Sequence, residues 1–144
     1  MKINKKYLPK SLSKKDQTEQ YKQLMKSRRL YVKGKYFTRK KMPSFKYKTS
    51  PHILKAIKIY GVDKIEPTLE LAKKTGCSIK ALEAIVKKGM GAYYSSGSRP
   101  NQTAESWGKA RLASAITGGK SSKVDFHIIK ECDHKMKAYK MALK

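Results

Sequence analysis

The chain has 144 residues, 39% of them hydrophobic, and its 35 lysines and arginines against 10 aspartates and glutamates give a formal net charge of +25. This length permits a small domain with a modest core and an arm, and no stretch approaches the roughly 18 apolar residues of a membrane span. Like charges in such number repel one another, so we expect nucleic acid or an acidic protein surface as the partner.

The first fifty residues hold much of the positive charge and few aliphatic side chains. Ser13 followed by Asp16 has the form of a helix start, and apolar residues at helical spacing predict a helix from about Lys14 to Arg29. Its apolar stripe, formed by Tyr21, Leu24 and Met25, is thin, and such a helix needs packing on other groups. We therefore expect residues 1–50 to form a basic arm with one helix and an extended segment.

Aromatic rings alternate with lysines in the extended segment that follows this helix. Such a pattern suits base stacking combined with phosphate pairing, and it also suits an arm whose rings attach it to its own domain or to a neighbouring subunit. We favour the second interpretation, because no aromatic motif of the known RNA-binding modules is present. The expected arm contacts are Tyr31, Tyr36, Phe37, Arg39 and Phe45, and Tyr47 shares the pattern.

Residues 51–144 are expected to form a compact α-helical domain. Ser50 and Pro51 predict a helix start, Gly61 predicts its end, and Ile53, Leu54, Ile57 and Tyr60 form its apolar face. Two helices around Gly76 then have the spacing of a helix-turn-helix over residues 67–88. Plain architecture is the favoured interpretation, because such pairs are common in helical domains. The alternative is a DNA-binding module whose contact residues are Ser78, Lys80, Lys87 and Lys88.

The stretch from Gly89 to Gly119 is poorer in lysine and predicts an ordered loop that leads into a helix. We expect Gly89 and Gly91 to allow positive φ, and Thr103 to cap a helix over residues 104–116 that stops at Gly118. A cation beside a helix N-terminus suits a phosphate or a partner carboxylate, although loop hydrogen bonds would use the same groups. The candidate binding residues are Arg99, Asn101, Gln102, Trp107 and Arg111.

Trp107 and Arg111 lie four residues apart, which favours either an internal cation–π stack or an outward binding surface. Beyond this helix, Ser122 and Asp125 predict a further helix start, with Val124, Ile128 and Ile129 facing the core. The sequence thus predicts a mainly α protein: a small helical domain with an extended basic N-terminal arm.

No catalytic motif is recognisable, so we expect a non-enzymatic protein without a cofactor or a small-molecule substrate. The two cysteines, Cys77 and Cys132, suit a reducing compartment and predict no disulfide framework. His127, Cys132 and His134 raise a zinc site as the alternative. Their spacings match no common zinc arrangement, so a structural role for the cysteines and no metal are expected.

Part of the chain resembles uncharacterised proteins of large double-stranded DNA viruses, with similar stretches in marine phages. The resemblance lies in the string GAYYSSGSRPNQT, in the longer segment from KKGMGAYY to KVDFHI, and in the upstream segment YVKGKYFTRKKMPSFKYKTSPHILKAIKIYGV. The resemblance implies a location in the virion or in the cytoplasm or nucleus of an infected cell. The resemblance and the high net positive charge together lead us to expect a minor capsid, cement or inner-capsid protein. Such a protein would bind capsid proteins and, as an option, duplex DNA. The alternative is a free helix-turn-helix DNA-binding protein.

Overall fold

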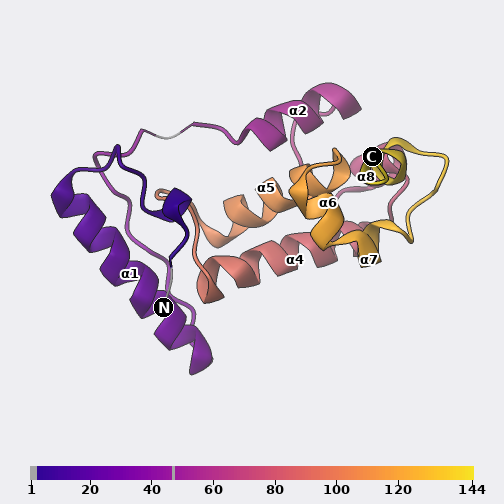
Figure 1. Cartoon of the computed structure of the whole chain (residues 1–144). Helices are drawn as coiled ribbons and strands as arrows, with labels where there is room; N and C mark the ends of the chain where they lie inside the picture. The colour runs from indigo at the N-terminus through magenta and orange to yellow at the C-terminus, as the bar shows by residue number, and fades with distance from the viewer. Residues whose placement is uncertain (1–2, 47) are drawn as a thin grey trace. The chain divides into compact units, whose positions relative to one another are not determined.

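The computed structural model describes residues 3–46 and 48–144, and every regular element in these ranges is helical (Figure 1). The prediction of a mainly α protein is confirmed. No β-strand occurs in the described ranges, so non-helical backbone groups must find their partners in turns, side chains or water. In chain order the elements are η1 (Lys5–Tyr7), α1 (Lys14–Val32), α2 (Pro51–Tyr60), α3 (Leu69–Thr75), α4 (Ile79–Ser95), α5 (Ala104–Ile116), α6 (Lys120–Val124), α7 (Phe126–Ile129) and α8 (Lys137–Ala142).

The chain groups into two compact units that are each discontinuous in sequence. Unit 1 comprises residues 1–48 and 90–107, and unit 2 comprises residues 49–89 and 108–144. The boundary near residue 50 was expected, but residues 90–107 were assigned to the C-terminal domain and instead group with residues 1–48. Helices α4 and α5 each contribute residues to both units. The N-terminal 48 residues are thus the larger part of a compact unit that residues 90–107 complete.

Several helix ends that were predicted from capping residues are confirmed, but α1 continues past the expected end at Arg29 to Val32, and the start expected at Ser122 lies inside α6, which begins at Lys120. Ser13 Oγ accepts the Asp16 N–H at 3.1 Å, and α1 begins at Lys14. Pro51 opens α2, and Gly61, with φ +61°, ends it in the left-handed conformation that glycine adopts without strain. Helix α5 has the predicted bounds. These starts and stops depend only on local sequence, which is why they could be read in advance.

The interior of unit 1 is largely polar. The inner face of α1 buries Gln20, Gln23 and Ser27 beside Leu24, whereas Tyr21 of the expected apolar stripe is 47% exposed. These polar groups pair with backbone that has no helical partner, as when Gln23 Oε1 accepts the Lys40 N–H at 2.6 Å. A helix therefore packs on an extended segment through hydrogen bonds, and an apolar stripe was the wrong signal for its inner face.

Asp16 shows the same principle at the start of α1. Its Oδ2 atom accepts the Ser44 backbone N–H at 2.9 Å and also the Ser44 hydroxyl. These two hydrogen bonds from Ser44 hold the pKa of Asp16 below its ordinary value. The first turn of α1 and the segment near residue 44 are therefore fixed to each other by an ionised carboxylate.

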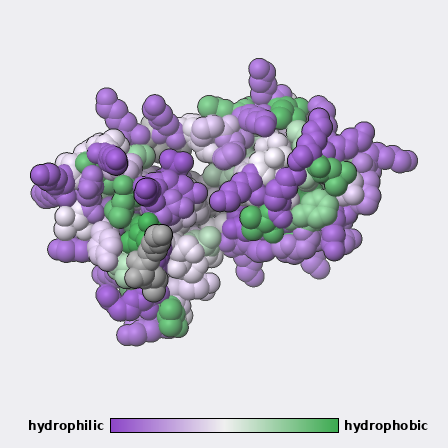
Figure 2. All heavy atoms as spheres, viewed as in Figure 1, coloured by the Kyte–Doolittle hydropathy of each residue, from purple (hydrophilic) through white to green (hydrophobic). Residues whose placement is uncertain are grey.

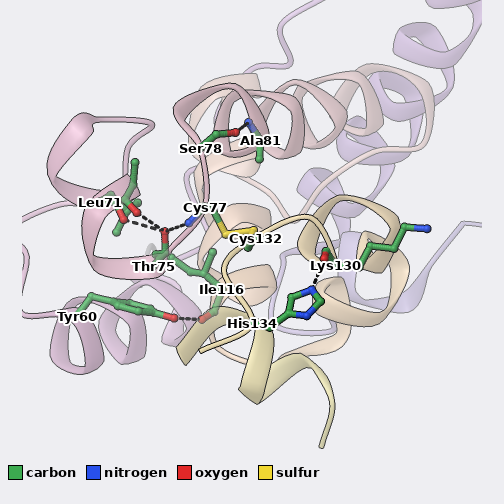
Figure 3. The surroundings of a disulfide bond; sticks show 11 residues. Tyr60, Leu71, Thr75, Cys77, Ser78, Ala81, Ile116, Lys130, Cys132 and His134 are labelled. Carbon is green, nitrogen blue, oxygen red and sulfur yellow. Dashed lines mark hydrogen bonds between the residues drawn. A yellow bond between two sulfur atoms is a disulfide. The ribbon is translucent and has the colours of Figure 1, made fainter. Parts of the chain in front are cut away.

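Unit 2 contains the apolar core. Tyr60 is buried there and its hydroxyl donates to the Ile116 carbonyl (Figure 3). Two residues expected in the core are exposed instead, Leu54 by 57% and Val124 by 55%, because α2 turns Ala56 and Tyr60 inward and α6 ends at Val124. The buried hydrophobic residues of this core are Ala56, Tyr60, Val62, Ile65, Leu71, Cys77, Leu82, Ile85, Leu112, Ala113, Ala115, Ile116, Ile129, Cys132, Ala138 and Ala142.

Cys77 and Cys132 are joined by a disulfide, so the expectation of free thiols is wrong (Figure 3). Their Cα atoms lie 4.4 Å apart although 55 residues separate them in sequence. Cys77 follows the turn at Gly76, where its backbone N–H donates to Thr75 Oγ1 at 3.1 Å. The bond ties the turn between α3 and α4 to the segment after α7, a proximity that sequence spacing could not reveal.

Gly89 and Gly91 do not form a loop, because α4 runs without interruption through both to Ser95. Neither has positive φ. A Cβ added at Gly89 would lie 2.6 Å from the Cα of Gly108, which shows that the backbones of α4 and α5 touch at this point. Gly89 thus serves close helix packing, and the expectation of an ordered loop with positive φ at Gly89 and Gly91 is wrong.

Candidate nucleic-acid interface

Arg39 is the buried cation of unit 1. Its side chain is only 7% exposed and lies over the Tyr93 ring, 3.8 Å from the ring centre. The guanidinium donates to the Tyr93 carbonyl at 2.7 Å, to Ser98 Oγ at 2.8 Å and to Ser27 Oγ at 3.0 Å. Burial lowers the pKa of Arg39 from its ordinary value, while nearby tyrosines oppose the shift. Arg39 was expected as an arm contact, and it joins the extended segment to α1 and α4.

Two further arginines reach the same part of unit 1. The Arg28 Nε and Nη2 atoms both donate to the Ser96 carbonyl, at 2.9 and 2.7 Å. Arg99, three residues after Ser96, is exposed. Burial raises the pKa of Tyr7, and the charges of Arg28, Arg39 and Arg99 act in the opposite direction. The Tyr7 hydroxyl therefore lies within the field of three guanidinium groups, of which Arg39 is buried and Arg99 is exposed.

Asn101 and Gln102 were expected either to bind a phosphate or to make loop hydrogen bonds, and in the structure their side chains make internal hydrogen bonds. Asn101 Oδ1 accepts the Met42 N–H at 2.6 Å, and its Nδ2 donates to the Phe45 carbonyl at 3.0 Å. Asn101 also has φ +63°, which asparagine tolerates better than most residues. Gln102 Oε1 accepts from Ser106 Oγ at 2.7 Å. Both hold the loop in shape, and of the expected loop set Arg99 is the exposed cation.

Trp107 and Arg111 do not stack on each other. The Trp107 ring packs edge-on against Tyr7, with centroids 6.0 Å apart, and the Lys6 ammonium lies 5.9 Å from the Trp107 ring centre. The guanidinium of Arg111 instead pairs with Asp125. A spacing of four residues suggested one helix face, but each side chain contacts a group elsewhere in its own unit.

Asp125 is the buried anion of unit 2 and was expected to be only a capping residue. Its carboxylate is fully buried, accepts Arg111 Nε at 2.8 Å and Nη2 at 2.9 Å, and lies 3.3 Å from Lys88 Nζ. Burial alone would raise the pKa of Asp125, but the hydrogen bonds and charges of Arg111 and Lys88 hold it below its ordinary value. A bidentate arginine fork makes this an ordered ion pair.

The helix-turn-helix residues are divided between structure and surface. Gly76 takes the turn with φ +82°, and Ser78 Oγ caps α4 by accepting the Ala81 N–H at 3.0 Å. Lys88 belongs to the Asp125 pair. Lys80 and Lys87 are exposed on one face of α4, but the exposed Glu83 stands between them. An acid at the centre of that face disfavours approach to phosphates.

The remaining arm residues lie on the surface of unit 1. Tyr31 and Tyr36 contact each other with ring centroids 6.1 Å apart. Lys26 Nζ lies 4.4 Å from the ring centre of Phe37. Phe45 is partly buried and its N–H donates to the Met42 carbonyl at 3.0 Å. Tyr47 lies outside the described residues. These contacts are with residues of the same unit, which is one of the two attachments that the favoured interpretation allows.

Within residues 3–46 and 48–144, no three histidine, cysteine or acidic side chains come together as a metal site would require. In the same ranges, no helix has both the length and the apolar character that crossing a bilayer demands, in line with the expectation from hydropathy.

Comparison with known proteins gives one result. No curated protein and no solved structure shows a significant match. Residues 4–135 match the model of a family described as "Family of unknown function (DUF5824)". This match spans both units and includes the three arginines near Tyr7. On this match the chain belongs to the DUF5824 family.

Proposed function

We propose that this protein is a non-enzymatic structural protein of a viral particle, and that it lies against packaged duplex DNA and contacts the phosphate backbone through its lysines. The single observation that carries the proposal is how the charges are used. Asp125, Asp16 and Glu66 are engaged by hydrogen bonds or cations of their own unit. The lysines are largely exposed, and hydrophilic residues dominate the visible face (Figure 2). The unbalanced charge therefore faces outward, where a polyanion can release counterions on binding.

Unit 1 carries the larger imbalance. Its sequence has 18 lysines and arginines against 3 acids, whereas unit 2 has 17 against 7. Exposed cations without acidic neighbours give phosphate contacts that do not depend on base sequence. We therefore assign the main DNA contact to the exposed cations of unit 1, among them Arg99, whereas the buried Arg39 holds the unit together from inside.

The particle as the setting is supported by the resemblance of the GAYYSSGSRPNQT region to proteins of large DNA viruses. The disulfide between Cys77 and Cys132 fits a released particle, because virions lie outside the reducing cytosol. The acidic surface of a neighbouring capsid protein is the other source of neutralising charge. Copurification with particles at a fixed ratio, and retention after the DNA is digested, would favour that partner over the genome.

The helix-turn-helix function remains a second proposal, because the left-handed turn at Gly76 and the exposed Lys80 and Lys87 have the form it requires. It predicts a strong preference for one DNA site. The structural proposal predicts affinities that hardly vary among unrelated duplexes.

Titration of several unrelated duplexes at increasing salt distinguishes the two. A backbone-driven interface with six to ten phosphate contacts should lose about 10³- to 10⁵-fold in affinity between 50 and 200 mM salt. The double variants Lys33→Ala with Lys35→Ala, in unit 1, and Lys80→Ala with Lys87→Ala, on α4, remove equal charge. Greater loss from the unit 1 pair supports the proposal. A preference for one duplex above about a hundredfold, lost with the α4 pair, would support the alternative.

A further inference from the structure

Three tyrosine rings meet on the surface of unit 1 near the end of α1. Tyr31 and Tyr94 are parallel, with an interplanar angle of 8° and centroids 6.4 Å apart. Tyr36 closes the group, 5.0 Å from Tyr94 and 6.1 Å from Tyr31. Tyr93 lies edge-on against Tyr94 from the buried side. We call Tyr31, Tyr36 and Tyr94 the tyrosine cluster.

The cluster is built by the turn that ends α1. The Gly34 N–H donates to the Tyr31 carbonyl at 2.9 Å and the Lys35 N–H donates to the Leu30 carbonyl at 2.9 Å, while Gly34 has φ +78°. This C-terminal motif reverses the chain so that Tyr36 returns onto Tyr31. The cluster is therefore held by backbone geometry and does not depend on a bound partner.

The outer ring of the cluster is open to solvent. Tyr36 is 72% exposed and Val32, one residue after Tyr31, is 88% exposed. The exposed Tyr36 ring and the exposed Val32 side chain do not gain the free energy that burial would give. Tyr93, which lies behind the cluster, is fully buried. The fold thus supports one aromatic surface from behind and leaves its front uncovered.

The surroundings of the cluster are cationic. Lys33 and Lys35 flank Gly34 in the turn and are exposed, and Lys26 lies over the next ring along the chain, Phe37. Burial, followed by the charge of Glu105, raises the pKa of Tyr94. Cations at the edge of exposed rings are the arrangement by which proteins hold single-stranded nucleic acid, with bases on the rings and phosphates on the lysines.

We propose that the tyrosine cluster is a stacking site for unpaired bases of single-stranded nucleic acid, with Tyr36 as the ring on which a base lies. The proposal rests on the proposed nucleic-acid binding but goes beyond it, because a duplex keeps its bases stacked inside and offers this surface only its backbone. An acidic protein segment would use the lysines and would gain nothing from a base-sized aromatic face.

The test compares two oligonucleotides of equal charge on the full chain. One is oligothymidylate of about twelve nucleotides and the other has the same backbone without bases, so their affinities differ by base contacts alone. Wild type should bind the oligothymidylate about tenfold more tightly than the abasic strand, and Tyr36→Ala should remove most of this difference. Tyr36→Phe keeps the ring and should retain it.

The matched control is Tyr21→Ala, because Tyr21 is an exposed tyrosine of the same helix, α1, that lies outside the cluster. It should leave the preference for bases unchanged. Circular dichroism checks that each variant keeps its helices. Equal wild-type affinity for the two strands, or equal effects of Tyr36→Ala and Tyr21→Ala, would overturn the stacking site while leaving backbone binding intact. Failure to bind either strand, or duplex DNA, would contradict the proposed function and the stacking site together.

Discussion

The two units of this protein are stabilised by different chemistry. Unit 2 buries a continuous apolar core, adds a disulfide and contains one buried ion pair at Asp125. Unit 1 buries few large apolar side chains and relies on hydrogen bonds with backbone groups, in which Arg39 donates and Asp16, Gln23 and Asn101 accept. A typical hydrogen bond contributes about 1 kcal/mol net, less than the roughly 1.5–3 kcal/mol of a buried aliphatic side chain.

This difference coincides with the distribution of charge. The unit with the weaker apolar core is also the unit with the greater excess of cations, and it holds the three arginines near Tyr7 and the tyrosine cluster. Self-repulsion destabilises a compact state, and a bound polyanion relieves it. We infer that unit 2 is the stable scaffold and that unit 1 gains most from its partner.

The largest single effect is expected in unit 2 from Asp125→Asn. The substitution leaves Arg111 and Lys88 without their anion, and breaking a buried pair costs about 3–5 kcal/mol, near the lower end here because both cations are partly exposed. Denaturant unfolding measures the loss, and Glu131→Gln, an exposed acid nearby, serves as the neutral control. An unchanged midpoint for Asp125→Asn would show that the pair adds no stability.

The same pair predicts a pH dependence. The pKa of Asp125 is lower in the folded state than in the unfolded chain, so its contribution is complete above the unfolded value and is lost as the pH falls through the folded value. Acid unfolding of wild type should therefore be steeper than that of Asp125→Asn.

The next effect is expected in unit 1 from Arg39→Ala. It removes the donors to the Tyr93 carbonyl and the Ser27 and Ser98 hydroxyls, and unsatisfied buried groups cost about 1–3 kcal/mol. Arg39→Lys keeps the charge but loses the planar fork, and should recover only part of the stability. Limited proteolysis of Arg39→Ala should cleave unit 1 and spare residues 49–89. If Arg39→Lys equals wild type, charge alone matters at this position.

The last prediction compares two glycines of α4. Alanine at Gly89 would meet the Gly108 backbone, so overpacking should destabilise unit 2 by about 1–3 kcal/mol. A Cβ added at Gly91 would meet only the Tyr31 hydroxyl, at an ordinary contact distance of 3.7 Å. Because alanine has a better helix propensity than glycine, Gly91→Ala should stabilise the chain by about 0.5–1 kcal/mol. Thermal melting of the two variants should therefore shift in opposite directions, and a shift in the same direction would contradict the close packing of α4 on α5.

Much of the helical structure follows from local sequence. The starts at Ser13, Ser50 and Thr103 and the stop at Gly61 depend on side-chain caps and glycine backbone freedom within a few residues. Pairings over long distances could not be obtained that way. Predicting such pairings requires knowledge of which helices pack together. Examples are the Cys77–Cys132 bond, the Arg111–Asp125 ion pair and the contact of Gly89 with Gly108.

The candidate site was foreseen only in part. Arg99 was singled out from its loop and is exposed, and Tyr36 was named as an arm ring. Arg28 was not chosen, because a basic residue near the end of a helix ordinarily serves the helix dipole. Its fork on the Ser96 carbonyl depends on residues 90–107 folding against α1. Asn101 and Gln102 were chosen for their polarity, which the loop uses internally.

The central claim is that unit 1 is the part of the protein that a polyanion stabilises. The most direct test is amide hydrogen exchange with and without duplex DNA. In low salt, DNA should slow exchange in the described parts of residues 1–48 and 90–107 and leave the core of unit 2, including α3 and Ile129, unchanged, and added salt should remove the effect. Protection that is spread equally over both units, or that is confined to α3 and the first turns of α4, would contradict it.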